Sequence, residues 1–290
     1  MTIQKLLSKA QDILGADRLL DAEVLLANLL DKDKLYLLVS LDEEVSLDVE
    51  GLFILYLNRL KNGEPLAYLL SEKEFYGLSF YVDKRVLIPR PETEQIVDRA
   101  VVFLSERSSF KHQMKFLDVG TGSCNIPIAI LQNLDDLDIE IFADACDISV
   151  DALEVAQINI EQHSLEESIE LFQSDLLENV EDYEHYDLIV ANLPYIGEKE
   201  NRYVDENVEK YEPNLALFGG DNGLELYEDM FAQMEEKEIS FDLMIGEFGF
   251  NQGDLMEEIL EAYFPGKWKI VKDLADIDRI FLVAGDTGLA

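Results

Sequence analysis

The feature that most constrains the fold is a regular alternation, from residue 91 onward, of short apolar runs with longer amphipathic stretches. The short runs are bounded by Gly, Asp or Asn, as is typical of buried strands. The longer stretches repeat apolar residues at three- and four-residue spacing, which indicates helices. Such alternation predicts an α/β domain, in which a parallel sheet is covered by helices on both faces. The predicted strands are 115–120, 139–147, 169–173, 187–192, 242–248, 267–272 and 279–285, and the predicted helices are 91–107, 125–133, 151–163, 223–236 and 251–263.

The preceding part of the chain has a different pattern. Apolar residues recur at helical spacing in LLSKAQDIL, LLDAEVLLANLL and VEGLFILYLNRL, which predicts a small helical bundle with Asp17 and Ser46 as helix caps. Strand-forming residues follow, and we expect them to form a β-hairpin that turns at Asp83 and Lys84. The predicted organisation is a helical domain (1–74), a hairpin linker (75–90) and an α/β domain (91–290).

The charge of the chain restricts its partners. It has 61 acidic and 23 basic residues, and a formal net charge of −38. This charge repels phosphate backbones, so we expect no stable binding of nucleic acid without a local basic patch. The densest basic cluster is the short segment DKRVLIPR, residues 83–90. The acidity is explained by solubility alone, or by attraction of a basic protein partner.

Other bulk properties point to a cytoplasmic protein. No apolar stretch approaches the roughly 18 to 20 residues of a membrane span. The only two cysteines, Cys124 and Cys146, lack metal-type spacing and fit a reducing compartment. We therefore expect no membrane association and no metal.

The segment FLDVGTGSCNIPIAI, residues 116–130, is a predicted strand, glycine turn and helix. Gly120 and Gly122 allow the backbone to turn sharply and to approach a ligand closely. We expect Asn125 to cap the helix, with Pro127 in its first turn. A glycine turn alone is weak evidence for any one ligand.

Acidic residues follow three successive strands. Asp118 lies at the end of the first, and this carboxylate suits a ligand with a cationic amino-acid end better than a pyrophosphate. Asp147 ends the second strand, where an acid commonly binds ribose hydroxyls. Asp175 follows the third and is placed to accept from an adenine amino group. Each acid alone reads as a surface residue, but together they favour S-adenosylmethionine over NAD or a nucleoside triphosphate.

Asn192, Leu193, Pro194 and Tyr195 follow the fourth strand, at the same edge of the sheet. One interpretation is an ordinary turn with a buried aromatic. The other is a clamp for a planar NH₂ group, in which the Asn192 side-chain oxygen and the Leu193 carbonyl each accept one N–H. Tyr195 would then pack against the planar group.

These segments, in this order, resemble the release-factor glutamine N5-methyltransferases (the HemK or PrmC family). The resemblance covers about residues 60 to 285 and rests on PRPETE, FLDVGTGS, VANLPYI, EPNLALFGGDNGLELY and GEFGFNQGDLMEEIL. It implies a Rossmann-like class I methyltransferase sheet, mostly parallel with an antiparallel C-terminal strand, and an N-terminal helical domain. The implied reaction transfers methyl from S-adenosylmethionine to the glutamine of the Gly-Gly-Gln motif in class 1 peptide chain release factors.

The resemblance also implies site residues. Those implied for the cofactor are Asp118, Gly120, Thr121, Gly122, Asp147, Ile148, Asp175, Leu176, Asn192, Glu92 and Thr93, and those implied for the substrate are Asn192, Leu193, Pro194, Tyr195, Pro89 and Arg90. Without the resemblance, the sequence around Pro91 indicates only the start of a helix. Two positions depart from the family pattern: Leu193 replaces a proline, and Cys124 replaces a glycine.

Two alternatives stay open. An adenine N6-methyltransferase acting on RNA or DNA would present the same NH₂ group to the same clamp. A diverged, non-catalytic paralogue would use the fold as a binding module. For the methyltransferase we expect a monomer that needs no general base, with Asn192 as its catalytic centre and with Pro194 and Tyr195 shaping it.

Overall fold

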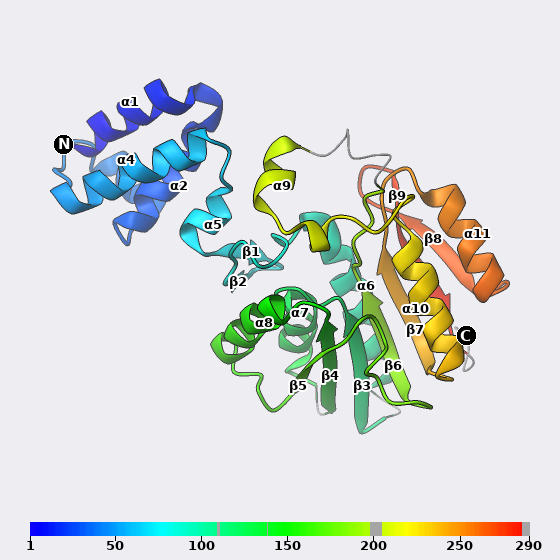
Figure 1. Ribbon diagram of the computed structural model, residues 1–290. Helices are drawn as coiled ribbons and strands as arrows, with labels where there is room; N and C mark the ends of the chain where they lie inside the picture. Colours follow the sequence, from blue (N-terminus) through cyan, green and yellow to red (C-terminus); the bar gives the residue numbers. More distant parts are fainter. Residues whose placement is uncertain (109–110, 138, 198–204, 286–290) are drawn as a thin grey trace. The chain divides into compact units, whose positions relative to one another are not determined.

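The computed structural model describes residues 1–108, 111–137, 139–197 and 205–285. Its internal contacts divide the chain into two compact units, Met1–Glu72 and Lys73–Ala290. Figure 1 shows the helices of the first unit and the central sheet of the second. Among the described residues, no helix combines the length and hydropathy that crossing a membrane requires.

The first unit is a helical bundle, as predicted. It contains α1 (Ile3–Leu14), η1 (Ala16–Arg18), α2 (Leu19–Leu29), α3 (Lys34–Val39), α4 (Leu47–Lys61) and α5 (Leu66–Leu70). Leu6, Leu25 and Phe53 are fully buried in its separate core. The Ser46 hydroxyl accepts from the Val49 amide and caps α4, as predicted, whereas Asp17 lies inside η1 and caps nothing. The 3₁₀ turn before α2 takes the place of the side-chain cap that we expected.

The second unit contains a seven-stranded sheet in the order β5-β4-β3-β6-β7-β9-β8. Its strands are β3 (Gln113–Val119), β4 (Glu140–Asp147), β5 (Ile169–Gln173), β6 (His185–Ala191), β7 (Ser240–Glu247), β8 (Trp268–Lys272) and β9 (Asp278–Ala284). The first five are parallel, and β9 pairs antiparallel with both β7 and β8. This arrangement confirms the predicted α/β fold with an antiparallel C-terminal strand.

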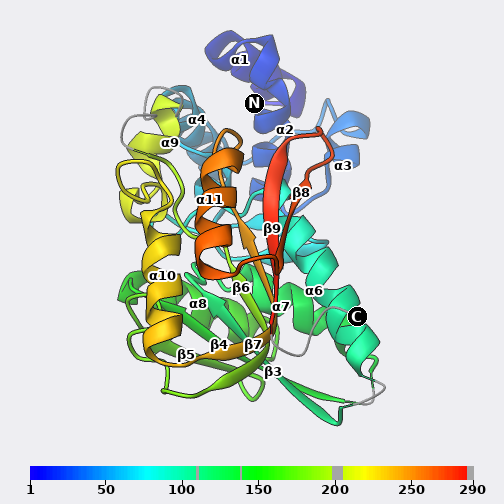
Figure 2. The ribbon, with the colours of Figure 1, turned by 90° about the vertical axis from the view of Figure 1, so that its right-hand side faces the viewer.

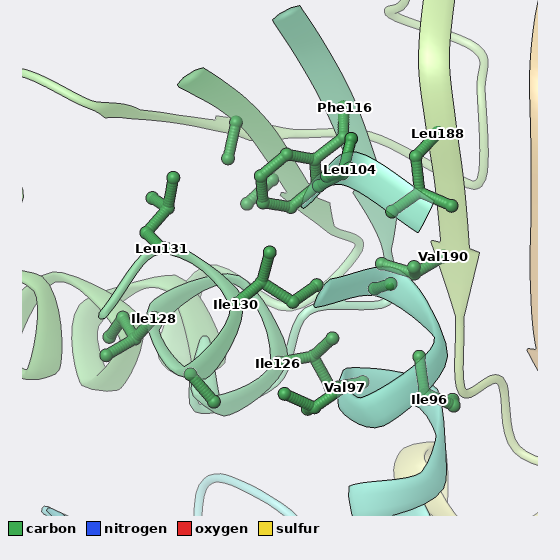
Figure 3. Packing of buried hydrophobic residues seen from close by; sticks show 14 of the residues in the cluster. Ile96, Val97, Leu104, Phe116, Ile126, Ile128, Ile130, Leu131, Leu188 and Val190 are labelled. Atoms are coloured by element: carbon green, nitrogen blue, oxygen red, sulfur yellow. The ribbon is translucent and has the colours of Figure 1, made fainter. Parts of the chain in front are cut away.

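Helices cover both faces of the sheet (Figure 2). Successive residues of a strand point to opposite faces, so each strand contributes side chains to both layers. One face packs against α6 (Glu94–Arg107), α7 (Asn125–Leu134) and α8 (Val150–Gln162), and the other against α10 (Glu225–Glu236) and α11 (Gly253–Tyr263). In Figure 3, Phe116 and Leu188 meet Ile130 of α7 and Leu104 of α6 on the first face. The described residues also form the short helices η2 (Pro91–Thr93), α9 (Glu206–Tyr211) and η4 (Asn214–Ala216).

The expected hairpin turn at Asp83 and Lys84 was wrong. The hairpin is shorter, with β1 (Lys73–Phe75) paired to β2 (Leu78–Phe80). Its turn consists of Tyr76 and Gly77, both with positive φ, which matches the twist of paired strands. Asp83 instead begins a separate turn that closes with Val86 N–H donating to the Asp83 carbonyl.

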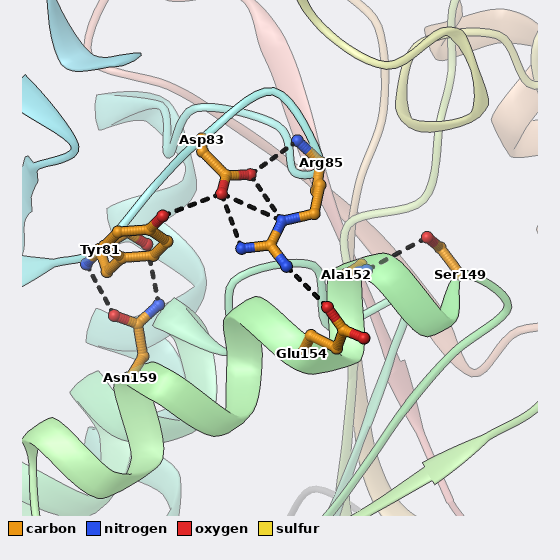
Figure 4. Close-up of polar contacts among 7 residues, drawn as sticks. All are labelled: Tyr81, Asp83, Arg85, Ser149, Ala152, Glu154 and Asn159. Carbon is orange, nitrogen blue, oxygen red and sulfur yellow. Dashed lines mark hydrogen bonds and ion pairs between the residues drawn. The ribbon is translucent and has the colours of Figure 1, made fainter. Parts of the chain in front are cut away.

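The segment after the hairpin is fastened to α8 (Figure 4). The buried Asn159 side chain accepts from the Tyr81 amide at 2.7 Å and donates to the Tyr81 carbonyl at 3.0 Å. Arg85 joins Asp83 to Glu154 of α8. These contacts fix the path of residues 81–90, which then form one wall of the site.

Candidate active site

The site lies where the strand order reverses. From β3 the chain proceeds to β4 and β5 on one side, and then to β6 and β7 on the other. In the β3–β6 pair, Val119 lies opposite Ala191, so Gly120 and Asn192 leave the sheet side by side. Such a switch point opens a crevice at the carboxyl ends of the strands. A cavity of about 330 Å³ occupies it, which is within the range of small-molecule sites.

The glycine turn after β3 forms the floor of this cavity. The Gly120 and Thr121 amides both donate to the Cys146 carbonyl at 2.9 Å, which holds the turn against β4. Gly120 and Gly122 have φ of +76° and +56°, which glycine adopts without strain. Cys124 has φ of +61° and is the N-cap of α7, so Asn125 is the first helical residue and not the predicted cap. Pro127 lies in the first turn, as expected.

Asp147 connects the glycine turn to α8. Its two carboxylate oxygens accept from the Gly122 and Ser149 amides, each at 2.9 Å. Burial raises the pKa of Asp147, and these backbone donors oppose that increase. Because each carboxylate oxygen has further lone pairs, Asp147 can still accept hydrogen bonds from a ligand in the cavity that it lines.

Asp118 lies beneath the glycine turn, and the cavity-lining residues include Val119 but not Asp118. Its side chain is completely buried, and neither oxygen has a hydrogen-bond partner among the described residues. Burial raises its pKa to about 7. An unpaired buried carboxylate is costly alone and favours a ligand with a positive charge. This property fits the cationic amino-acid end of S-adenosylmethionine.

The rest of the wall is mainly apolar. Ile148, Leu176 and Ile126 line the cavity, and Ile148 remains exposed in part, which suits a flat ring. Of the other expected residues, Pro89, Arg90, Thr93, Thr121 and Asp175 line the cavity. Glu92 does not line it and is solvent-exposed.

Asn192 and Leu193 present two acceptor oxygens at the other side of the crevice. The Asn192 Nδ2 group donates to Thr93 Oγ1 at 3.0 Å, and its Oδ1 accepts no hydrogen bond from the described residues. The carbonyl of Leu193 likewise accepts none from this part of the chain. Asn192, Leu193 and Pro194 line the cavity, whereas Tyr195 does not. Within the described residues, both oxygens therefore keep their acceptor capacity.

The backbone of a second segment, residues 219–223, packs closely against the turn at residues 192–195. A Cβ at Gly219 would lie 2.0 Å from the Pro194 carbonyl oxygen, and one at Gly223 would lie 2.1 Å from the Tyr195 carbonyl oxygen. The Gln252 side chain donates to the Tyr195 and Asn222 carbonyls at 2.7 and 2.9 Å. The conformation of the turn at residues 192–195 therefore depends on the glycines in FGGDNG and on the glutamine in FNQGD.

Glu247, at the end of β7, contacts the turn from below. It is 1% exposed, and its carboxylate accepts from the Thr93 hydroxyl at 2.7 Å and the Tyr195 hydroxyl at 3.2 Å. The Tyr227 hydroxyl lies 2.5 Å from the Glu247 carbonyl oxygen and 3.2 Å from that of Ala191. Sequence reasoning missed both residues, although a charged residue inside the apolar run LMIGEF was a usable signal for Glu247.

The basic segment next to the site is largely neutralised. Arg90 forms an ion pair of 2.6 Å with the buried Glu212, whose other oxygen accepts from the Ile88 amide. Arg85 is paired with Asp83 and Glu154, as described above. Two of the three cations in DKRVLIPR are therefore occupied by carboxylates, which leaves little positive charge for a nucleic-acid backbone.

The fold and the site define a class I methyltransferase, and S-adenosylmethionine is its cofactor. The family model "Methyltransferase small domain" matches residues 93–212, and "PrmC N-terminal domain" matches residues 5–70. The catalytic domain of human METTL16, solved with an RNA hairpin, has a TM-score of 0.57 at 15% identity over 77% of this chain and 80% of that one. Likeness at that identity shows the fold alone.

Curated relatives have a higher sequence identity to this chain than METTL16 has. The release factor glutamine methyltransferase of Koribacter versatilis is 35% identical over 90% of this chain and 89% of its own length. That of Clostridium acetobutylicum is 33% identical over 90% of each chain. The chain belongs to the release factor glutamine methyltransferase family.

Proposed function

We propose that this protein methylates the side-chain amide nitrogen of the glutamine in the Gly-Gly-Gln motif of class 1 peptide chain release factors. The observation that carries the proposal is the pair of free acceptor oxygens, Asn192 Oδ1 and the Leu193 carbonyl, beside a cavity suited to S-adenosylmethionine. Family membership supports the choice of substrate. Because translation termination is cytoplasmic, we place the protein there, acting as a monomer.

This chain's own groups would hold the cofactor. The glycine turn would let the backbone approach it, Asp147 would accept from the ribose hydroxyls, and Asp175 would accept from the adenine amino group, since all of them line the cavity. The positive charge of a bound cofactor would favour the ionised form of Asp118, whose oxygens have no partner among the described residues. S-adenosylmethionine, when bound, supplies an electrophilic methyl group on a sulfonium.

The two acceptor oxygens of the clamp compensate for the low nucleophilicity of the glutamine amide nitrogen. An amide nitrogen reacts poorly because its lone pair is delocalised into the carbonyl. Two acceptors that bind its two hydrogens fix its orientation, which is a positioning effect, and they stabilise positive charge that develops on nitrogen. Asn192 and Leu193 therefore supply both effects, and the methylated amide loses its proton to water without a general base.

The test is transfer of labelled methyl from S-adenosylmethionine to a purified class 1 release factor. A Gly-Gly-Gln variant without the glutamine and ribosomal RNA serve as parallel substrates. We expect label on the native release factor alone. Label on RNA would favour adenine N6-methylation, and no label together with no cofactor binding would favour a non-catalytic module.

A further inference from the structure

One buried carboxylate connects both sides of the substrate clamp. Glu247 Oε2 accepts from the Thr93 hydroxyl, and Oε1 accepts from the Tyr195 hydroxyl. Thr93 in turn lies 3.0 Å from Asn192 Nδ2. A relay of two hydrogen bonds therefore runs from Glu247 of β7 through Thr93 of η2 to Asn192, the residue that follows β6.

The direction of each bond follows from the hydrogens available. A hydroxyl has one hydrogen, and an ionised carboxylate has none. Thr93 gives its hydrogen to Glu247, so its oxygen can only accept from Asn192. The Asn192 NH₂ group therefore faces Thr93, and Oδ1 faces the cavity. This assignment depends on the network and not on the similar shapes of the amide oxygen and nitrogen.

We propose that Glu247 is a positioning residue, which acts through Thr93 to hold Asn192 with its oxygen toward the substrate. The inference rests on the proposed function of Asn192 as a clamp for nitrogen. It also assigns specificity, because an oxygen-lined clamp accepts a group that carries two N–H hydrogens and disfavours a carboxylate, which has none.

Glu247 must be ionised to impose this direction. Burial raises its pKa, while the Thr93 and Tyr195 hydroxyls and the positive charge of Arg279 on β9 lower it, and Glu92 raises it. A protonated Glu247 could donate to Thr93, which would free the Thr93 hydrogen for Asn192 and allow the amide to flip. The relay therefore weakens as pH falls through the raised pKa of Glu247.

The experiment compares Glu247→Gln, Thr93→Val and the double variant. With the wild-type substrate, we expect each single change to lower kcat by on the order of 10²-fold, as for loss of one oriented catalytic group. Cofactor affinity measured by calorimetry should change less than threefold for Glu247→Gln. The double variant should be no slower than the slower single variant, because both changes break the same relay. Losses that multiply would overturn the proposal.

Controls separate positioning from stability. Asp144→Asn removes another buried carboxylate that accepts from a tyrosine hydroxyl, Tyr186, in the interior of β4. It should lower the melting temperature without changing kcat. Thr93→Ser keeps the hydroxyl and should recover most of the rate lost in Thr93→Val. The acid limb of the wild-type pH profile should be absent from Glu247→Gln.

A readout without turnover distinguishes failure of this inference from failure of the proposed function. The Asn192 side-chain amide signal, assigned in a ¹⁵N-asparagine spectrum by its loss in Asn192→Asp, should shift in Glu247→Gln and Thr93→Val but not in Asp144→Asn. An unmoved signal would overturn the relay even if release factors are methylated. A moved signal with unmethylated release factors would instead contradict the proposed substrate.

Discussion

At the residue scale, the proposed mechanism assigns the most direct role in the reaction to the Asn192 side chain. Asn192→Ala removes one of the two acceptors beside the cavity, so we expect methyl transfer to slow by on the order of 10²-fold or more. Binding of S-adenosylmethionine, followed by calorimetry, should change little. Asn133→Ala on α7, whose amide donates to the Ala129 carbonyl within its own helix, is the matched control. Near-full activity of a folded Asn192→Ala protein would contradict the clamp.

The raised pKa of Asp118 predicts that the stability of the folded protein depends on pH. Its pKa rises from the ordinary 3.8 to about 7 in the folded protein because of burial. Between these values the folded state holds a proton that the unfolded state has released, so the free energy of unfolding falls as pH rises through this window. Asp118→Asn cannot titrate, and its stability relative to wild type should therefore increase from about pH 4 to pH 8.

Denaturant unfolding of the cofactor-free protein at several pH values measures this difference. Asp135→Asn, at an exposed carboxylate just after α7, is the matched control for loss of one acidic side chain. Asp118→Asn should also bind S-adenosylmethionine more weakly, because the amide has no charge to offer a cation. A flat difference for Asp118→Asn would show that the carboxylate is not protonated in the folded state.

At the element scale, the turn after β6 depends on glycines from a distant segment. Gly223 and Gly77 both have positive φ, so alanine at either position incurs about 1 to 2 kcal/mol of backbone strain. Only at Gly223 would the added Cβ meet backbone, at 2.1 Å from the Tyr195 carbonyl oxygen. We therefore expect Gly223→Ala to cost about 1 to 3 kcal/mol more than Gly77→Ala.

Thermal unfolding and methyl transfer together test this comparison. Gly77→Ala should keep the rate of the wild type, while Gly223→Ala should lose activity as the clamp is displaced. Similar losses in both variants would mean that φ alone matters and that the close approach is relieved elsewhere.

Elements with strong periodicity were predictable from sequence, and elements set by distant partners were not. The seven strands of the sheet follow from runs such as FLDV and LIVA, whose apolar character needs no knowledge of neighbours. The hairpin was misplaced because Tyr76 and Gly77 were not recognised as its turn. Glu247 and Thr93 are 154 residues apart in the chain, so no local pattern indicates their contact.

At the scale of the whole molecule, the two units have separate hydrophobic cores. We predict that the helical unit adds a contact to a folded release factor and takes no part in the chemistry. Deleting residues 1–72 should then raise KM for the intact factor about tenfold or more. A short Gly-Gly-Gln peptide, compared in the same assay, should keep its KM and kcat. Equal effects on both substrates would refute the role.

Because both thiols are buried next to the glycine turn, their reactivity reports on the opening of that turn. Cys124 ends that turn, the Cys146 carbonyl accepts from the Gly120 and Thr121 amides at its start, and both side chains are buried. Burial also raises the pKa of each thiol, which keeps them unreactive while covered. Modification by a maleimide therefore requires local opening, and its rate measures how often the turn opens. A cofactor bound against this turn should slow maleimide labelling as its occupancy of the site rises. The labelling rate of the chain's own two cysteines therefore measures cofactor binding without an added probe.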